Sequence, residues 1–575
     1  MLTDDLPRDW WKRAVVYQVY PRSFADSDGD GVGDLRGVIS RLDHLQRLGV
    51  DVLWLGPVYR SPQDDNGYDI SDYQDVDPLF GTLADLDELL ARAHDRGIRV
   101  VMDLVVNHTS DEHPWFVDSR SSRDSARRDW YVWRPPRPGT VGGEPGAEPT
   151  NWGSVFSGSA WEWDEATGDY YLHLFSRKQP DLNWQNPEVR EAVYAMMRWW
   201  LDRGVDGFRM DVINLIDKPD ELVDAEVGLG DLWGQGFPMI ANGARVHDHL
   251  REMHEQVFAD HPRAFLTVGE MPGVTAERAA LFTDPARREV DMVFQFEHVD
   301  LGSGPGGKFD RVPSGMPHLR ESLMRWQTAL AETGWNSLYW NNHDQPRAVS
   351  RFGDDDPAWR ERSAKTLGTV LHTLRGTPYV YQGEELGMTN APVSGREDLR
   401  DIEALNYLDE MTAAGSSFED LLPGIRAVGR DNARTPVQWT AGRHAGFTTG
   451  EPWIAVNPDH VEINAEAQVG VEGSVFEHYR RLVALRHDDP VVSHGSITPL
   501  AMDHPSLWAF EREHEGVRLR TLAAFTREPV PVPAELLAGW RQATVVLATS
   551  DEAGRSLLED GVLPGWESVV LRLAS

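Results

Sequence analysis

The sequence predicts an α/β protein: a (β/α)8 TIM barrel with a small subdomain inserted after the third strand and an antiparallel β domain at the C-terminal end. Three observations lead to this fold class. Eight short apolar runs alternate with segments of helical period, one long Trp-, Gly- and Pro-rich stretch interrupts them, and the alternation ends near residue 497. The length of 575 residues and the hydrophobic share of 41% suffice for a large barrel core.

Each predicted strand is a short run rich in Val, Ile, Leu and aromatic residues. These runs cover residues 15–24, 50–58, 98–108, 205–213, 264–271, 291–298, 336–344 and 377–387. Segments with apolar residues at helical spacing lie between most of them, for example 34–49, 82–97, 187–203, 243–259 and 357–375. Eight strands that alternate with helices are typical of a closed parallel barrel.

Two stretches fall outside this alternation. Residues 109–174 follow the third strand and are far longer than an ordinary loop between a strand and its helix. Short alternating apolar runs with turn residues follow residue 496 and indicate a small antiparallel β domain. We therefore predict a first barrel part at 1–106, an inserted subdomain at 107–175, a second barrel part at 176–496 and a C-terminal β-sandwich domain at 497–575.

Composition excludes several classes of function. The formal net charge of −36 disfavours nucleic acids and anionic membranes as partners, because binding to either needs a basic surface. The absence of cysteine rules out disulfides, thiolate nucleophiles and zinc–thiolate sites. The N-terminal residues form no secretory apolar region, and no apolar run approaches the roughly 18 residues of a membrane span. We expect a cytoplasmic protein that is a monomer or a homodimer.

Acidic side chains stand at the ends of three predicted strands. In the fourth strand, Arg209 and Asp211 are two residues apart and therefore project from the same face, toward the barrel interior. The other ionisable residues at strand ends are Glu270, Asp344, His108 and His343. Because the carboxyl ends of barrel strands carry the active site in this fold, we expect these side chains to meet at one mouth.

Three carboxylates and an arginine at one mouth suit the hydrolysis of glycosides. A retaining mechanism needs an ionised carboxylate as nucleophile and a second carboxyl group of raised pKa as acid and base, about 5–5.5 Å apart. Arg209 beside Asp211 would keep the nucleophile ionised, and the apolar strand that leads to Glu270 favours a raised pKa for that acid. The alternative is an arginine–aspartate pair that only fills the barrel, and it leaves the acids on the other strands unexplained.

Five motifs connect the chain to a known family. They are DLVVNH at 103–108, QPDLN at 179–183, GFRMDV at 207–212, VGE at 268–270 and NNHD at 341–344. With these motifs in this order, the chain resembles glycoside hydrolase family 13, the α-amylase family, over nearly its whole length. The resemblance implies that Asp211 is the nucleophile, that Glu270 is the acid and base, and that Asp344 is a carboxylate that binds sugar hydroxyls.

The resemblance also implies a substrate-binding set around the first sugar. Tyr68 would stack on the terminal glucose, and Asp65 and Arg430 would close the pocket around its outer hydroxyls. A closed end implies exo action, with small oligosaccharides as the partners. The remaining residues that match binding positions of the family are His108, Phe156, Phe175, Gln179, Arg209 and His343.

Within the family, the chain resembles oligo-1,6-glucosidases and dextran glucosidases, on segments such as GEMPGVT at 269–275 and MVFQFEHVDL at 292–301. Val212, next to the nucleophile, matches the valine associated there with α-1,6 linkages. The resemblance thus implies a retaining, exo-acting α-glucosidase that releases α-glucose from the non-reducing end of short oligosaccharides and prefers α-1,6 linkages of the isomaltose type. Transglycosylation is a further outcome of the same mechanism.

Other activities on the same scaffold stay open. They are those of an α-1,4-glucosidase or sucrase and of a trehalose-6-phosphate hydrolase, which would need a phosphate site. A non-catalytic carbohydrate-binding or transporter-associated protein of this fold is disfavoured, because all three acids are present and no membrane span is predicted.

One acidic loop resembles the beginning of an EF-hand. The stretch DSDGDGVGD at 26–34 has aspartates at loop positions 1, 3 and 5 and glycine at 6, but Gly37 stands where position 12 needs a bidentate glutamate. Relatives in the family bind a cation at the matching loop, so we expect a structural Ca²⁺, with Mg²⁺ as the alternative. The predicted ligands are Asp26, Asp28, Asp30, the Val32 carbonyl and Asp34.

Overall fold

Eight parallel strands form a barrel at the centre of the molecule. The computed structural model describes residues 7–228 and 232–573. The strands are β1 (Val16–Val19), β2 (Val52–Leu55), β5 (Arg99–Val105), β9 (Gly207–Asp211), β10 (Leu266–Glu270), β11 (Met292–Phe294), β14 (Ser337–Leu338) and β15 (Thr377–Tyr381). Their hydrogen-bonded order is β11-β10-β9-β5-β2-β1-β15-β14, and a parallel bridge between Val293 and Asn336 joins the two ends of this order. The predicted (β/α)8 barrel is therefore confirmed.

The strands are shorter than the apolar runs that predicted them. The run 15–24 yields only β1, because Pro21 has no N–H for a strand ladder and begins a 3-10 turn at Pro21–Ser23. The run 336–344 yields only β14. The rest of this run is a loop at the carboxyl end of the strand, and this loop carries His343 and Asp344.

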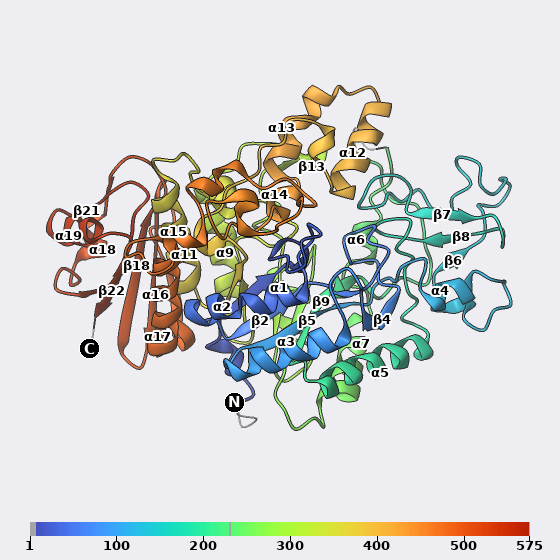
Figure 1. The fold of residues 1–575 in the computed structure, drawn as a ribbon, viewed down its shortest axis with the longest axis horizontal. Helices are drawn as coiled ribbons and strands as arrows, with labels where there is room; N and C mark the ends of the chain where they lie inside the picture. Colours follow the sequence, from blue (N-terminus) through green and yellow to red (C-terminus); the bar gives the residue numbers. More distant parts are fainter. Residues whose placement is uncertain (1–6, 229–231, 574–575) are drawn as a thin grey trace.

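Helices surround the barrel, and the sequence marks several of their ends (Figure 1). Helix α5 (Pro187–Arg203) coincides with the predicted segment, because Asn186 caps its first turn, Pro187 occupies the first helical position and Gly204 ends it in the left-handed conformation. The predicted segment 34–49 forms two helices, α1 (Leu35–Ser40) and α2 (Leu42–Leu48). The other predicted segments contain α3 (Leu83–Asp95), α7 (Val246–Met253) and α11 (Arg360–Thr373). In the part of the chain that the structure describes, no helix has the length and apolar character needed to cross a bilayer.

The inserted subdomain follows β5 and lies at the right of Figure 1. It contains helix α4 (Pro114–Ser119) and a three-stranded antiparallel sheet in the order β6-β8-β7. The strands are β6 (Trp133–Arg134), β7 (Trp161–Asp164) and β8 (Asp169–Leu172). Two aromatic side chains from this region, Phe156 and Phe175, reach the barrel mouth.

The C-terminal domain is built on one five-stranded antiparallel sheet. Its order is β16 (Ser496–Leu500), β17 (Leu507–His514), β18 (Val517–Ala524), β22 (Ser568–Leu573) and β20 (Thr544–Ala548). Successive side chains point to opposite faces, so Trp508 and Phe510 pack against the barrel while Leu507 and Ala509 face outward. Helices α18 (Ala534–Leu537) and α19 (Asp551–Glu559) and the two-stranded β19–β21 ribbon (Val530–Pro531 with Val562–Leu563) pack on the outer face. Within the described residues, the second layer of the predicted β-sandwich is therefore only this short ribbon together with two helices.

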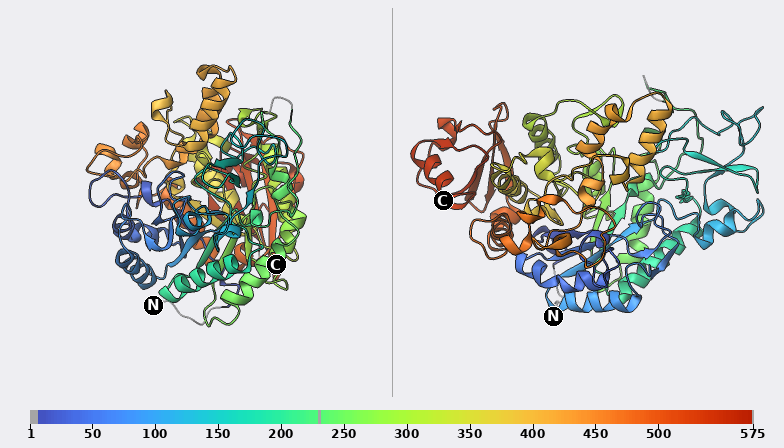
Figure 2. Two further views of the ribbon diagram at one scale, coloured as in Figure 1. Left: turned by 90° about the vertical axis from the view of Figure 1, so that its right-hand side faces the viewer. Right: turned by 45° about the horizontal axis from the view of Figure 1, so that its top comes forward.

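Two helices that the sequence did not predict stand above the barrel mouth (Figures 1 and 2). They are α12 (Ile402–Ala413) and α13 (Phe418–Val428), in the connection between β15 and the last barrel helix, α16 (Val475–Asp488). Helix α13 packs on strand β13 (Gly307–Arg311) so closely that a Cβ atom on Gly424 would lie 2.0 Å from the carbonyl oxygen of Phe309. A glycine at this position lets the two backbones touch.

We therefore predict that Gly424→Ala destabilises the protein. The added methyl group would push α13 off β13, at a cost of roughly 1–3 kcal/mol for overpacking. The measurement is the melting temperature, with Gly315→Ala as the matched control, because a Cβ atom there meets only Pro317 Cδ at 3.7 Å. Equal melting temperatures for the two variants would contradict the close packing of α13.

Candidate active site

A cavity of about 430 Å³ opens at the carboxyl ends of the barrel strands. Asp211 at the end of β9, Glu270 at the end of β10 and Asp344 after β14 all line it, so the structure brings together the three predicted acids. The predicted binding residues that line the same cavity are Asp65, Tyr68, His108, Phe156, Phe175, Val212 and Arg430. The other three, Gln179, Arg209 and His343, are buried and contact lining residues from behind.

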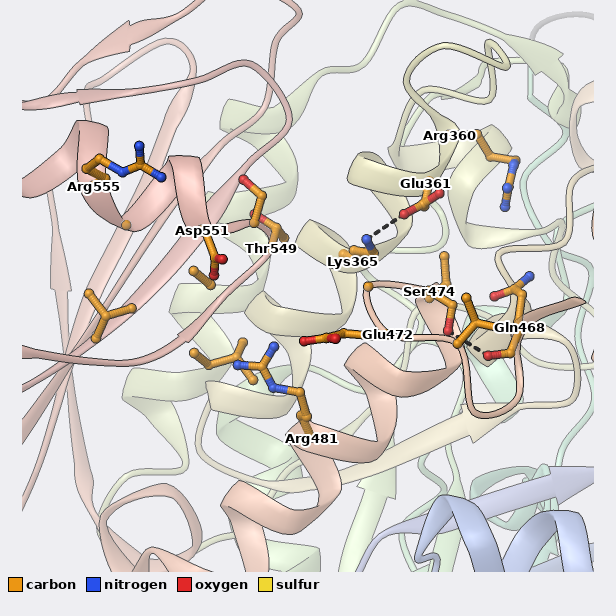
Figure 3. A pocket seen from close by; sticks show the side chains of 18 of the residues that line it. Arg360, Glu361, Lys365, Gln468, Glu472, Ser474, Arg481, Thr549, Asp551 and Arg555 are labelled. Carbon is orange, nitrogen blue, oxygen red and sulfur yellow. Dashed lines mark hydrogen bonds and ion pairs between the residues drawn. The ribbon is translucent and has the colours of Figure 1, made fainter.

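A larger cavity, of about 1080 Å³, lies at the seam between the barrel and the C-terminal domain (Figure 3). Its walls carry charges of both signs. Lys365 and Glu361 form an ion pair there, and Arg481 and Asp551 also line the cavity. None of the described residues that line it is aromatic, and none is one of the predicted acids. The predicted catalytic acids therefore line the smaller cavity and not the larger one.

The guanidinium of Arg209 links three strand ends. Its Nη1 atom donates to Asp103 on β5 (2.7 Å) and to Asp211 on β9 (2.6 Å), and its Nη2 atom contacts the carboxyl group of Glu270 on β10. Only 1% of the arginine side chain is exposed, so these bonds are shielded from water. Trp54 lies against the guanidinium and donates its indole N–H to Asp103 (2.9 Å). One cation thus fixes two of the predicted catalytic acids relative to each other.

The two acids on this arginine differ in pKa. Burial raises the pKa of Asp211 to about 6, and Arg209 opposes this rise. Burial raises the pKa of Glu270 to about 8, with Arg209 again opposing and the charges of Asp211 and Asp344 adding to the rise. At neutral pH Asp211 is therefore ionised and Glu270 protonated, as a nucleophile and a general acid require. Arg209 acts on Asp211 in the predicted direction, but burial outweighs it.

Asp344 lies in a different electrostatic environment. Arg434 Nη2 donates to its carboxylate (2.7 Å), and Arg430 Nη1 lies 3.5 Å from the same oxygen. Burial alone would raise its pKa, but His343, Arg430 and Arg434 outweigh burial and hold the pKa well below its ordinary value. Burial lowers the pKa of His343 to about 3, so at neutral pH the imidazole is neutral and the two arginines supply the charge. Asp344 therefore stays ionised over the range in which the other two acids titrate.

Asp65 and Arg430 close one end of the cavity. Arg430 Nη2 donates to Asp65 Oδ1 (3.1 Å), and Gln179 Nε2 donates to the other carboxylate oxygen (3.2 Å). Asp401 binds the same guanidinium at 2.6 Å, and Phe156 covers it, with its ring centroid at 4.7 Å. The carboxylates, the guanidinium and the amide bond one another, and together they form a wall at this end of the cavity.

An aromatic stack supports the side wall of the cavity. Tyr68 lies parallel to His343, with ring centroids 5.1 Å apart and an interplanar angle of 5°, and Tyr20 stacks beyond His343 at 5.7 Å. Gln18 bonds His343 Nδ1 (2.8 Å), and His108 Nε2 bonds the Tyr68 carbonyl oxygen (3.1 Å). The orientation of the tyrosine ring that lines the cavity is therefore fixed.

Comparison with known proteins agrees with this geometry. Residues 18–495 match the family model described as alpha amylase, catalytic domain. The chain belongs to the α-amylase family, glycoside hydrolase family 13. It is 52% identical over 572 residues to the oligo-1,6-glucosidase of Parageobacillus thermoglucosidasius, an alignment that covers 99% of this chain and 100% of that one. It is 47% identical to the trehalose-6-phosphate hydrolase of Bacillus subtilis strain 168, over 100% and 99% of the two chains.

A solved structure supports the same assignment. The trehalose-6-phosphate hydrolase of Bacillus licheniformis matches this α-amylase-family chain with a TM-score of 0.91 at 43% identity, and the match covers 98% of this chain and 100% of the other. The family match over residues 18–495, together with the acids at the barrel mouth, identifies the protein as a glycoside hydrolase.

The sequence patterns do not predict several residues of this α-amylase-family site. They are Asp103, Lys308, Asp401, Glu403 and Arg434. Asp103 pairs with Arg209 in the β5–β9 register, and its place in the DLVVNH motif was a usable signal. The other four lie in long connections after β11 and β15, where no periodicity marks a side chain as inward.

Val212 combines two functions at the nucleophile. Its backbone adopts the left-handed conformation (φ 35°, ψ 40°), which is uncommon for a β-branched residue. In this conformation its N–H donates to Glu270 Oε2 (3.2 Å), while its side chain lines the cavity. The same residue therefore positions the acid through its backbone and borders the substrate through its side chain.

The acidic loop brings together three of the four predicted aspartates. Carboxylate oxygens of Asp26, Asp28 and Asp34 lie within 4.8 Å of one another. Asp30 is outside this group, and its carboxylate accepts a hydrogen bond from the Val32 N–H (2.8 Å) within the loop. Three carboxylates at this spacing fit a hard cation such as Ca²⁺, so the donor chemistry agrees with the prediction although the predicted ligand set is only partly assembled.

Because the site needs an ionised Asp211 and a protonated Glu270, we predict a bell-shaped dependence of kcat/KM on pH. The value should rise as the pH increases through about 6, where Asp211 loses its proton, and fall through about 8, where Glu270 loses its proton. Initial rates on an aryl α-glucoside test this. Glu270→Gln should remove the basic limb, since no proton is left to lose, and a basic limb that persists in this variant would refute the assignment.

Proposed function

We propose that the protein is a retaining, exo-acting α-glucosidase that releases α-glucose from the non-reducing end of short oligosaccharides and prefers α-1,6 linkages of the isomaltose type. The observation that supports this most strongly is the shared guanidinium, because Arg209 binds both Asp211 and Glu270. Two carboxyl groups on one guanidinium lie close together. This favours the roughly 5–5.5 Å spacing of retaining enzymes over the roughly 6.5–9.5 Å spacing of inverting ones.

In the proposed reaction, the Asp211 carboxylate attacks the anomeric carbon while Glu270 donates its proton to the glycosidic oxygen. The C–O bond breaks, the rest of the sugar chain leaves as an alcohol, and a β-glycosyl ester forms on Asp211. Glu270 then takes a proton from water, which attacks the same carbon and releases α-glucose. A sugar hydroxyl in place of water gives transglycosylation. Asp344, ionised beside two arginines, accepts hydrogen bonds from the sugar hydroxyls.

Exo action is supported by the closed end of the cavity. Asp65 and Arg430 pair with each other at one end of the cavity, and this pair would block a further sugar beyond the one held between Tyr68 and the acids. The cavity is also bordered by Lys308 and Glu403, which pair at 2.6 Å and are both partly exposed, and Glu403 lies 3.4 Å from Arg430. A chain therefore enters with its non-reducing end first.

The α-1,6 preference is supported by Val212 and by the relatives. Several similar proteins are named oligo-1,6-glucosidase, at 50–53% identity, and one at 45% is named glucan 1,6-alpha-glucosidase. The side chain of Val212, directly after the nucleophile in sequence, lines the cavity.

The second candidate is a trehalose-6-phosphate hydrolase, because proteins of that name are 47% and 43% identical to this chain. A phosphate needs an available cation. Among the described residues that line the cavity, the only lysine or arginine side chains are Lys308, paired with Glu403, and Arg430, paired with Asp65 and Asp401. Both are already neutralised, which disfavours this candidate.

We expect isomaltose to be hydrolysed with a higher kcat/KM than maltose, sucrose, trehalose or trehalose-6-phosphate. The measurement is glucose release from each sugar at equal concentration. Asp211→Asn is the control and should lose nearly all turnover, because no nucleophile remains. Val212→Thr should shift the preference from α-1,6 toward α-1,4 linkages. Trehalose-6-phosphate as the best substrate would favour the second candidate, and maltose as the best would reject the linkage preference alone.

The acidic loop is the proposed cation site. Asp26, Asp28 and Asp34 would supply carboxylate oxygens to Ca²⁺, with Mg²⁺ as the alternative. The loop packs against the segment 447–453, since Asp26 N donates to Phe447 O and Trp453 N donates to Gly31 O, each at 3.0 Å. A bound cation would thus stabilise the contact between the first strand's loop and a segment distant in sequence. The cytoplasmic location and the monomeric or dimeric state stay predictions from the sequence.

We predict that removing divalent cations with a chelator lowers the melting temperature and that added Ca²⁺ restores it, because an ion that binds only the folded state stabilises that state. Asp28→Asn should reduce this response. The comparison is made by thermal denaturation in both conditions, with Asp30→Asn as the matched control outside the cluster. No response of the unmodified protein to chelator or to Ca²⁺ would reject the site.

A further inference from the structure

A second cavity, also of about 430 Å³, adjoins the active-site cavity. The two share four lining residues, which are Val155, Phe237, Lys308 and Glu403. Asp65 and Arg430, which close one end of the active-site cavity, do not line the second cavity, although the shared residue Glu403 lies 3.4 Å from Arg430. A sugar chain with its terminal glucose at Asp211 would extend past the shared residues into this space.

The walls of the second cavity are largely aromatic and apolar. They include Leu232, Trp233, Phe237, Phe309, Tyr407 and Met411. The two faces of a glucose ring carry C–H groups while its hydroxyls point outward from the rim, so aromatic walls with a few polar groups at the edge suit a sugar ring. The Lys308–Glu403 pair supplies such polar groups at the boundary with the active-site cavity.

Trp233 is held in place from two sides. Its indole N–H donates to Glu410 Oε1 on α12 (2.9 Å), and the same oxygen accepts a hydrogen bond from the Gly158 N–H of the inserted subdomain (3.0 Å). A Cβ atom on Gly153 would lie 2.8 Å from the Trp233 Cβ, so the tryptophan also packs directly on the backbone of this subdomain. The side chain is half-buried and lines the cavity, which leaves part of the ring available to a ligand.

We propose that Trp233 is a stacking platform for the second sugar of the leaving group, and that Glu410 is its positioning residue. The first sugar of the leaving group would lie at the four shared residues and the second one beside the indole. The inference rests on the proposed function and adds a chain-length preference to it. A trisaccharide gains a contact at Trp233 that a disaccharide is too short to make.

The experiment compares the kcat/KM for isomaltotriose with that for isomaltose. In Trp233→Ala this ratio should fall roughly fivefold, the size expected for one lost aromatic contact. Trp233→Phe keeps a ring and should retain most of the ratio. The matched control is Trp163→Ala, because Trp163 is also a half-buried indole of this region, bonded to Glu165 (3.0 Å), but lines neither cavity. The control should have the wild-type ratio.

A wild-type ratio in Trp233→Ala would overturn the proposal. If that variant does not fold, Glu410→Ala, which frees the indole, tests the same ratio, and an unchanged value would likewise overturn it. The measurement is repeated with maltotriose and maltose. A wild-type enzyme that prefers maltose would reject the proposed linkage preference, but the ratio within each series still tests Trp233, so the two failures are distinguishable.

Discussion

The active site depends on a buried arginine that binds more carboxyl groups than one positive charge can neutralise. Arg209 contacts Asp103, Asp211 and Glu270, which come from three adjacent strands. Enclosed acids around a single cation cannot all ionise, because each negative charge raises the pKa of the others while burial raises all of them. Burial raises the pKa of Glu270 to about 8 and that of each aspartate to about 6, so the glutamate keeps the proton at neutral pH. The difference in pKa between the acid Glu270 and the nucleophile Asp211 thus arises because three buried carboxyl groups share one arginine.

The third acid, Asp344, does not share Arg209, because two other arginines lie beside it. Arg430 and Arg434 lie beside Asp344, and together they hold its pKa well below the ordinary value despite burial. Arg430 also binds Asp65 and Asp401 and so connects the ionised acid to the closed wall of the cavity. The site therefore has a protonated side at Glu270 and a permanently ionised side at Asp344, with the terminal sugar proposed to lie between them.

The sequence predicts the site residues that stand on or directly after the barrel strands, and it misses those that stand in the long connections. Alternation within a strand places Arg209 and Asp211 on one face, and barrel geometry brings Glu270 and Asp344 to the same end, so the three acids follow from local patterns and one fold rule. Lys308 and Asp401 cannot be found this way, since their positions depend on how long connections fold over the mouth. The cation loop shows the same limit. Its spacing suggests four aspartates, but only Asp26, Asp28 and Asp34 converge, and the Asp30 carboxylate lies outside their group.

The helices above the mouth explain how one set of acids can serve different substrates. Helix α12 contacts three separate walls of the cavities: Glu403 binds Lys308, Asn406 Nδ2 donates to the Phe156 carbonyl (3.1 Å), and Glu410 binds Trp233 and the inserted subdomain. None of these contacts involves Arg209 or the acids on the strands. A substitution in α12 can therefore move the walls that border the leaving sugars while the strand ends keep the charges that break the bond. The chemistry is fixed by the barrel, and the shape that selects among oligosaccharides is set by a connection that the barrel does not constrain.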